Sequence, residues 1–148
     1  MAIAIRSAGA GDSALIAALL DQLGYPAQAG EVATRLEYWL GDPHSALLVA
    51  EMAGIVVGVA ALHALPLLEH TARRGRLVAL VVHDRVRGQG IGKALMEAVE
   101  ERARELGCHD MEITSARDRA VAHRFYAGLG YDDVCGRAAR FVKALHSA

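Results

Sequence analysis

Leu77-Val-Ala-Leu-Val-Val-His-Asp-Arg-Val-Arg-Gly-Gln-Gly-Ile-Gly-Lys-Ala-Leu95 joins an apolar run to an amphipathic one through a glycine-containing turn. The apolar run over 77–82 is rich in valine, which predicts a buried β-strand. From Gly90 to Leu106 apolar residues recur at helical spacing, with Ile91, Leu95, Ala98, Arg102 and Leu106 along one side and Met96, Val99 and Ala103 beside them. The segment therefore predicts a strand, a turn and a helix in direct succession.

The turn between this strand and helix predicts an anion-binding site. Backbone N–H groups at the start of a helix have no partner within it, and the helix dipole adds partial positive charge there. Glycines at 88, 90 and 92 would let a phosphate approach the backbone closely. A pyrophosphate is the ligand that such a turn favours.

Two familiar phosphate-binding patterns do not fit this turn. The nucleotide P-loop needs a glycine five positions before its Gly-Lys pair and Ser or Thr after it, whereas Gly92-Lys93 has Arg87 and Ala94 there. The dinucleotide fingerprint needs a third glycine where Lys93 stands, and it belongs to repeated βαβ units. Both interpretations are weak.

The rest of the chain predicts further strands and helices around this segment. Strands are expected over 2–6, 46–52, 55–62, 111–114, 131–134 and 140–145, and helices over 13–23, 32–40 and 119–129. The short turn Ala53-Gly54 predicts an antiparallel hairpin, and the polar segment 65–75 predicts a surface loop or short helix. Together these elements predict a single α/β domain over 1–148, with a mixed, mostly antiparallel sheet flanked by helices.

Composition narrows the classes of function. The chain has 148 residues, 53% of them hydrophobic, and a formal net charge of -1, which gives no general attraction to nucleic acid or to an anionic membrane. No leader-like or membrane-spanning apolar stretch is present, so we expect a cytoplasmic protein. Cys108 and Cys135 lack the spacing of a disulfide framework or a zinc site, so we expect inert thiols and no metal.

Two motifs resemble those of the GNAT (GCN5-related N-acetyltransferase) family. Arg87-Gly88-Gln89-Gly90-Ile91-Gly92 resembles the R/Q-x-x-G-x-G/A coenzyme A motif, and it follows a strand and opens a helix as in that family. The stretch 122–131, Ala-His-Arg-Phe-Tyr-Ala-Gly-Leu-Gly-Tyr, resembles the family's second block, A-x-x-FY-x-x-x-GF. The order of the expected elements extends the resemblance over nearly the whole chain.

The resemblance implies a site for acetyl-coenzyme A, the acetyl donor. The pyrophosphate would be held by backbone amides of the motif, namely Arg87, Gly88, Gln89, Gly90, Ile91, Gly92 and Lys93. The backbone of Val81 and Val82 would pair with the pantetheine arm like an added strand. In this family the sheet splays apart at that point, here between 77–82 and 111–114, with Ser115 as a further cofactor contact.

The resemblance also implies catalytic roles. Tyr126 stands at the family's general-acid position, and a phenol can donate a proton to the departing thiolate. The alternative is that Tyr126 is only a core residue at helical spacing. Oxyanion stabilisation by a strand N–H such as that of Val82 is also expected.

No general base can be carried over from the family. The glutamate that many relatives carry early in the motif strand has no counterpart in Leu77-Val-Ala, which has no ionisable group. The open candidates are water, solvent, and the side chains of His63, Glu69, His70 and His83, with His63 preferred as facing the acceptor and His83 assigned to the turn.

The acceptor site is the least defined part of the sequence. Arg73, Arg74 and Arg76 would be solvated loop charges, or would meet an acidic acceptor or the 3'-phosphate of coenzyme A. Tyr38 is the freer candidate to border the acceptor pocket, and Trp39 is assigned to the core.

The function expected from these motifs is direct transfer of an acetyl group from acetyl-coenzyme A to a primary amine in a ternary complex. The amine would belong to a small molecule or a peptide, and the dimers common in the family leave a homodimer open. A non-catalytic acyl-coenzyme A sensor and a scaffold module are the alternatives.

Overall fold

The computed structural model describes residues 2–114 and 120–146. The chain divides into two compact units, residues 1–114 and 115–148, which are described separately. The first unit carries the sheet and three helices, and the second carries one helix. None of the helices in the described ranges is long and apolar enough to cross a membrane.

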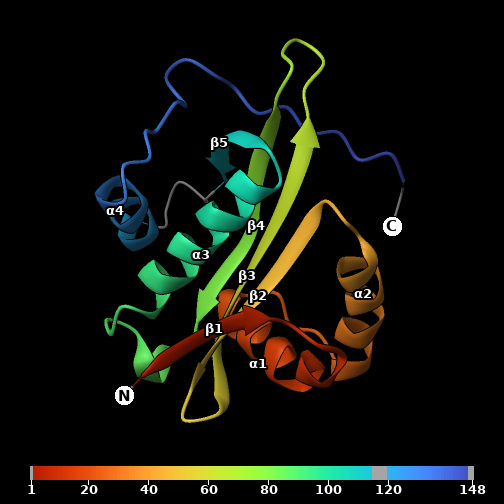
Figure 1. The fold of residues 1–148 in the computed structure, drawn as a ribbon, viewed down its shortest axis with the longest axis vertical. Helices are drawn as coiled ribbons and strands as arrows, with labels where there is room; N and C mark the ends of the chain where they lie inside the picture. The colour runs from red at the N-terminus through yellow and green to blue at the C-terminus, as the bar shows by residue number, and fades with distance from the viewer. Residues whose placement is uncertain (1, 115–119, 147–148) are drawn as a thin grey trace. The chain divides into compact units, whose positions relative to one another are not determined.

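The first unit is built on a five-stranded sheet in the order β1-β2-β3-β4-β5 (Figure 1). The strands are β1 (Ile3–Ser7), β2 (Ser45–Met52), β3 (Ile55–Pro66), β4 (Arg73–Val82) and β5 (Cys108–Ile113). Every neighbouring pair is antiparallel except β4 and β5, which are parallel. The mixed, mostly antiparallel sheet predicted from the sequence is therefore confirmed.

Helices cover both faces of this sheet. The helices α1 (Ser13–Leu23) and α2 (Ala29–Gly41) pack against one face, where Ile16, Leu19, Val32 and Leu36 join strand residues in one core. The helix α3 (Ile91–Glu105) covers the other face (Figure 1). A 3-10 turn, η1 (Ala10–Asp12), precedes α1.

The buried face of α3 differs from the predicted one. Ile91, Leu95, Met96, Val99 and Ala103 are buried, whereas Ala98, Arg102 and Leu106 are only partly covered. The larger apolar side chains occupy the buried face of the helix, and Arg102 pairs with Glu105 at 3.6 Å.

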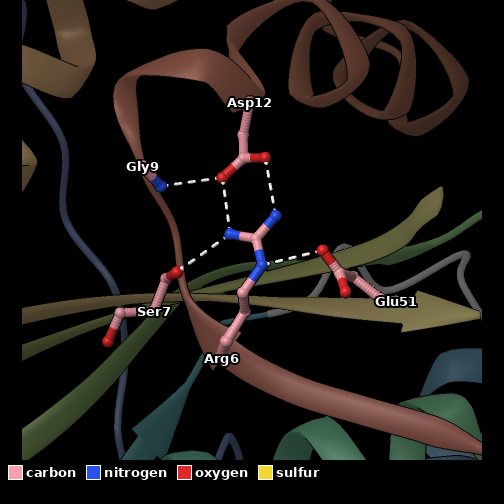
Figure 2. Close-up of polar contacts among 5 residues, drawn as sticks. All are labelled: Arg6, Ser7, Gly9, Asp12 and Glu51. Atoms are coloured by element: carbon pink, nitrogen blue, oxygen red, sulfur yellow. Dashed lines mark hydrogen bonds and ion pairs between the residues drawn. The ribbon is translucent and has the colours of Figure 1, made fainter. Parts of the chain in front are cut away.

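The first turn of the fold is fixed by a partly buried ionic network around Arg6 (Figure 2). Its guanidinium donates to both carboxylate oxygens of Asp12, at 2.8 and 2.9 Å, and its Nε donates to Glu51 at 2.8 Å. The Gly9 N–H donates to the same Asp12 carboxylate at 2.7 Å. Arg6 lies in β1, Asp12 in η1 and Glu51 in β2, so the network ties the turn that leads into α1 to two neighbouring strands.

Two predicted boundaries of the sheet are wrong. The β3–β4 ladder continues to Pro66 and Arg73, so the loop covers only 67–72 instead of 65–75. The strand β5 starts at Cys108, three residues earlier than predicted. These extensions do not look like strands in the sequence because they contain charged residues. In the structure these charges pair across β4 and β5, Arg74 with Asp110 and Arg76 with Glu112.

The second unit contains α4 (Ala120–Gly128), which ends in a hydrogen-bonded Schellman motif. The N–H of Tyr131 donates to the Tyr126 carbonyl at 3.1 Å, and the N–H of Gly130 donates to Ala127 at 3.1 Å. Gly130 has a φ of 93°, which a left-handed helix stop requires. The predicted helix and its stop are thus confirmed, apart from Arg119, which lies outside the described residues.

The two strands predicted in this unit are wrong. Residues 131–134 and 140–145 adopt no regular strand, and Phe141, Val142 and Leu145 are exposed. The Asp133 carboxylate instead accepts the N–H of Cys135 at 2.9 Å, and Val134 accepts the N–H of Arg137. These local turn bonds bend the backbone between the two segments.

Candidate functional site

The turn from β4 to α3 presents unsatisfied backbone donors. Gly88 and Gly90 have φ values of 78° and 84°, and Gly90 forms the N-cap of α3. No side chain caps this helix start, and its first internal bond runs from the Ala94 N–H to the Gly90 carbonyl. A Cβ added at Gly88 or Gly90 would meet no atom of the described part of the chain within 4 Å, so open space lies beside the donors there.

Hydrogen bonds to three other segments hold this turn in place. The His83 N–H donates to the Val57 carbonyl at 2.8 Å, and the Asp84 N–H donates to the Gln22 side chain of α1 at 2.9 Å. Arg87 folds back so that its Nε donates to the Val82 carbonyl at 3.1 Å. His83 caps the 3-10 turn η2 (Asp84–Val86), as expected of a turn residue.

The sheet opens next to this turn. The β4–β5 ladder runs only from Arg73 to Leu77, whereas β3 pairs with β4 as far as Val82. Within the described residues, the backbone of 78–82 therefore has no strand partner on the β5 side. Val81 and Val82, the residues expected to pair with a pantetheine arm, lie in this open stretch of strand.

A β-bulge stands where the sheet opens. Leu62 pairs with Leu77 and Ala61 pairs with Ala79, so Val78 is an extra residue in β4. A bulge shifts the alternation of side chains and commonly re-aims one of them beside a functional site. The Val78 side chain is exposed and lines a hollow of about 230 Å³ with Tyr38, Trp39, Ser45, His63, Leu65 and Arg76.

A row of polar side chains crosses the sheet at this hollow. Ser45 lies opposite His63 in the β2–β3 ladder, His63 opposite Arg76 in β3–β4, and Arg76 opposite Glu112 in β4–β5. Directly opposed residues share a face of the sheet. Arg76 lies 3.5 Å from Glu112, and both side chains are partly exposed, so this arginine can also meet a ligand.

Hydrogen bonds join one end of this row to the loop after α2. The Ser45 hydroxyl donates to the Asp42 carboxylate at 2.6 Å and lies 2.8 Å from His63 Nδ1. Asp42 also accepts the backbone N–H of His44 at 3.0 Å. The Ser45 hydrogen bond and the His44 N–H lower the pKa of the Asp42 carboxyl below its ordinary value, so it stays ionised near neutral pH.

The sequence-predicted residues divide between the two units. The cofactor-loop residues, Val81, Val82 and His63 lie in the first unit, together with the predicted pocket residue Tyr38. Trp39 contacts the core as predicted and also lines the hollow. Tyr126 lies in the second unit, where its ring makes edge contacts with Phe125 and Tyr131 at centroid distances of 5.4 and 6.2 Å. Ser115 lies outside the described residues.

The structure also shows where the predicted loop arginines, the candidate bases of the β3–β4 loop and the Cys108 thiol lie. Arg74 is a strand residue paired with both oxygens of Asp110, and Arg73 donates to the Leu106 carbonyl, so neither is a solvated loop charge. Glu69 and His70 lie in the exposed β3–β4 loop and not among the residues of the hollow. Burial raises the pKa of the Cys108 thiol, which disfavours the nucleophilic thiolate.

Asp42 and Ser45 were not predicted from the sequence to belong to a functional site. Asp42-Pro-His-Ser45 carries the short polar side chains typical of a turn, which is the signal it offered. Among the described residues, no group of three or more His, Cys, Asp and Glu is arranged to hold a metal ion.

The family of the chain is identified by comparing its sequence with known protein families. A sequence profile described as "Acetyltransferase (GNAT) family" matches residues 13–131, which is most of the chain. The chain therefore belongs to the GNAT acetyltransferase family.

Individual relatives share this family. The chain is 38% identical over 104 residues to the "Aminoalkylphosphonate N-acetyltransferase" of Salmonella typhimurium, covering 70% of this chain and 66% of that protein. It is 38% identical over 69 residues to the "Probable glucosamine 6-phosphate N-acetyltransferase" of Drosophila melanogaster, covering 47% of this chain and 30% of that protein. The matches thus span less than two thirds of either relative.

A solved structure of a "GNAT family acetyltransferase" from Staphylococcus aureus shares the fold. It superposes with a TM-score of 0.81 at 24% identity, covering 98% of this chain and 100% of that one. At this identity the likeness establishes the architecture alone.

Proposed function

We propose that this protein transfers the acetyl group of acetyl-coenzyme A to a small amine that also carries an anionic group. The observation that carries the proposal is the uncapped start of α3, with open space at Gly88 and Gly90, next to the backbone of 78–82, which within the described residues has no partner on the β5 side. Such a helix start suits a pyrophosphate, and an unpaired strand edge suits an extended amide chain. Coenzyme A has both parts.

The residues that would hold the cofactor follow from this arrangement. The backbone amides from Arg87 to Lys93 bind the pyrophosphate, and the backbone of Val81 and Val82 pairs with the pantetheine arm. The bound cofactor supplies an activated thioester. The Val82 N–H offers a hydrogen bond to the oxyanion that forms during transfer.

The hollow beside Val78 is the proposed acceptor site. It lies where the sheet opens, and its described lining combines the guanidinium of Arg76 with Ser45, His63 and apolar and aromatic side chains. Guanidinium groups bind phosphonate, phosphate and carboxylate groups through paired hydrogen bonds. The two relatives named above are, by their names, acetyltransferases of an aminoalkylphosphonate and of an amino sugar phosphate, which supports an anionic amine as acceptor.

Tyr126 is the proposed general acid. The amine would attack the thioester carbon directly, the C–S bond would break, and the departing sulfur would take the phenolic proton, which a proton lost from the attacking nitrogen would replace. Its ring contact with Tyr131 also fits a purely structural role at the helix end, so the assignment depends on kinetics. A covalent cysteine intermediate is not part of this proposal.

A panel of amines tests the function. Purified protein with acetyl-coenzyme A is given aminoalkylphosphonates, glucosamine 6-phosphate and the matching uncharged amines, and thiol release is followed. We expect turnover with the anionic amines, and a rise in their KM of about ten-fold or more for Arg76→Gln. Arg104→Gln, on the exposed face of α3, is the matched control and should behave as wild type.

The other outcomes of this panel are equally informative. Cofactor binding without turnover on any amine would favour the acyl-coenzyme A sensor instead. Equal KM values for anionic and uncharged acceptors would overturn the assignment of Arg76.

A further inference from the structure

We propose that Asp42, Ser45 and His63 form a proton relay in which Nε2 of His63 accepts the proton of the acceptor amine. The inference rests on the proposed acetyltransferase function and assigns the base that the motif strand lacks. Leu77, Val78 and Ala79 carry no ionisable group, yet an alkylammonium, with an ordinary pKa near 10.4, must lose a proton before it attacks.

The hydrogen bonds determine which nitrogen of His63 is available. An ionised Asp42 can only accept, so the single Ser45 hydroxyl proton goes to Asp42, at 2.6 Å. The Ser45 oxygen can then only accept from His63 Nδ1, 2.8 Å away. A neutral His63 therefore carries its proton on Nδ1 and a lone pair on Nε2.

The position of His63 suits a group that meets the acceptor. Its side chain is 31% exposed and lines the hollow at the opening of the sheet. Its ladder partner on β4 is Arg76, two residues before the bulge at Val78. Within residues 2–114 and 120–146, no hydrogen bond engages Nε2 of His63. An amine whose anionic group is held by Arg76 would thus lie beside this nitrogen.

Four other polar or charged groups surround the relay. Asp42 lies 3.5 Å from His63 Nδ1 and favours a positive charge on the ring, and His44 flanks Asp42 at 4.0 Å. Arg76, opposite His63, disfavours that charge, and Glu112 offsets Arg76. Tyr38 of α2 also lines the hollow. When the His63 ring takes the proton of the amine, it gains a positive charge that the nearby Asp42 carboxylate stabilises.

The proton and bond changes balance. The ammonium gives one proton to Nε2, and its nitrogen lone pair forms the bond to the thioester carbon. As the tetrahedral adduct collapses, the C–S bond breaks, the sulfur takes the phenolic proton of Tyr126, and the second proton of the nitrogen restores the phenol through solvent. The products are an amide, a free thiol and an imidazolium, which returns its proton to solvent. Asp42 and Ser45 act as positioning residues.

Kinetics of the whole protein provide one test. With an aminoalkylphosphonate as acceptor, His63→Gln should lower kcat by about a hundred-fold or more and remove the inflection caused by imidazole from the acid limb of the pH profile. Ser45→Ala should lower kcat by about ten-fold, the worth of one hydrogen bond, while keeping that inflection. His44→Gln is the matched control, because its side chain flanks the same carboxylate outside the hollow, and it should leave kcat unchanged.

The tautomer of His63 provides a second test that needs no turnover. Nitrogen-15 NMR of histidine-labelled protein above pH 8 should show His63 protonated on Nδ1, and Ser45→Ala should shift it toward the Nε2–H form. The His63 resonance is assigned from its absence in His63→Gln. A wild-type His63 protonated on Nε2 would overturn the relay.

The kinetic outcomes separate the two proposals. If wild type turns over anionic amines and His63→Gln has the same kcat and pH profile, the relay fails while the acetyltransferase function stands. If wild type and all variants bind acetyl-coenzyme A by calorimetry but acetylate no amine, the function fails and the relay with it.

Discussion

Replacing Asp12 with Asn should destabilise the first unit by about 2 kcal/mol at pH 7. The Asp12 side chain is 12% exposed and makes paired hydrogen bonds to Arg6. Breaking a fully buried ion pair by removing one partner costs about 3–5 kcal/mol, and exposed pairs contribute about 0.2–1 kcal/mol. Arg6 is 40% exposed and keeps its bond to Glu51 in the variant, so the expected loss lies between these limits.

The same network predicts how this difference depends on pH. The hydrogen bonds from Arg6, with a further one from the Gly9 N–H, lower the pKa of Asp12 in the folded state. Between the lowered pKa and the ordinary carboxyl pKa of about 3.9, the unfolded chain binds more protons than the folded one. The stability from Asp12 is therefore complete above about pH 4 and is lost as pH falls through the folded-state pKa.

Urea unfolding followed by the fluorescence of Trp39 measures the effect in the unit that contains the network. Asp110→Asn is the matched control, because Asp110 also binds an arginine through both oxygens but is 41% exposed. It should cost less than about 1 kcal/mol. Equal losses for the two variants at pH 7, or an Asp12 effect that persists unchanged to pH 3, would refute the reasoning.

Two further predictions concern packing and catalysis. Gly75→Ala should lower the free energy of unfolding by about 1–3 kcal/mol, because the added Cβ would lie 2.5 Å from Met111 Sδ and 3.2 Å from a Leu62 methyl. Adding Met111→Ala should recover part of this loss, whereas additive losses in urea unfolding would contradict the prediction. Tyr126→Phe should lower kcat for thiol release by about a hundred-fold with little change in acetyl-coenzyme A binding, and an unchanged kcat would leave Tyr126 with a structural role only.

The sequence predicted the succession of strand, glycine-containing turn and helix from β4 to α3 because all of its signals are local. Valine-rich residues, glycines at 88 and 90, and the periodicity of α3 follow one another directly, and the structure forms the strand, turn and helix in that order, although β4 begins at Arg73, four residues earlier than expected. The end of α4 was predicted from an equally local signal, the glycine at position 130. Such features depend on backbone preferences and helix periodicity, which are encoded within a few residues.

The acceptor hollow could not be predicted because it depends on strand register. A regular hairpin that pairs Met52 with Ile55 would place Ser45 opposite Leu62, which faces the other side of the sheet. An irregularity after Ala50 leaves Val57 unpaired and shifts the register by one residue, so Ser45 meets His63 instead. The bulge at Val78 has a similar effect on β4. The apolar residues around both bulges carry no pattern that marks them.

The proposed coenzyme A site lies at the start of α3, and calorimetric titration of acetyl-coenzyme A tests it most directly. Gly90→Glu places a carboxylate beside the proposed pyrophosphate, where repulsion should weaken binding by a hundred-fold or more. Gly107→Glu is the matched control, because Gly107 also has a positive φ and open space around its Cα but lies at the other end of α3. We predict binding by wild type and Gly107→Glu with loss in Gly90→Glu. Absence of binding to wild type, or equal affinity for all three proteins, would contradict the account.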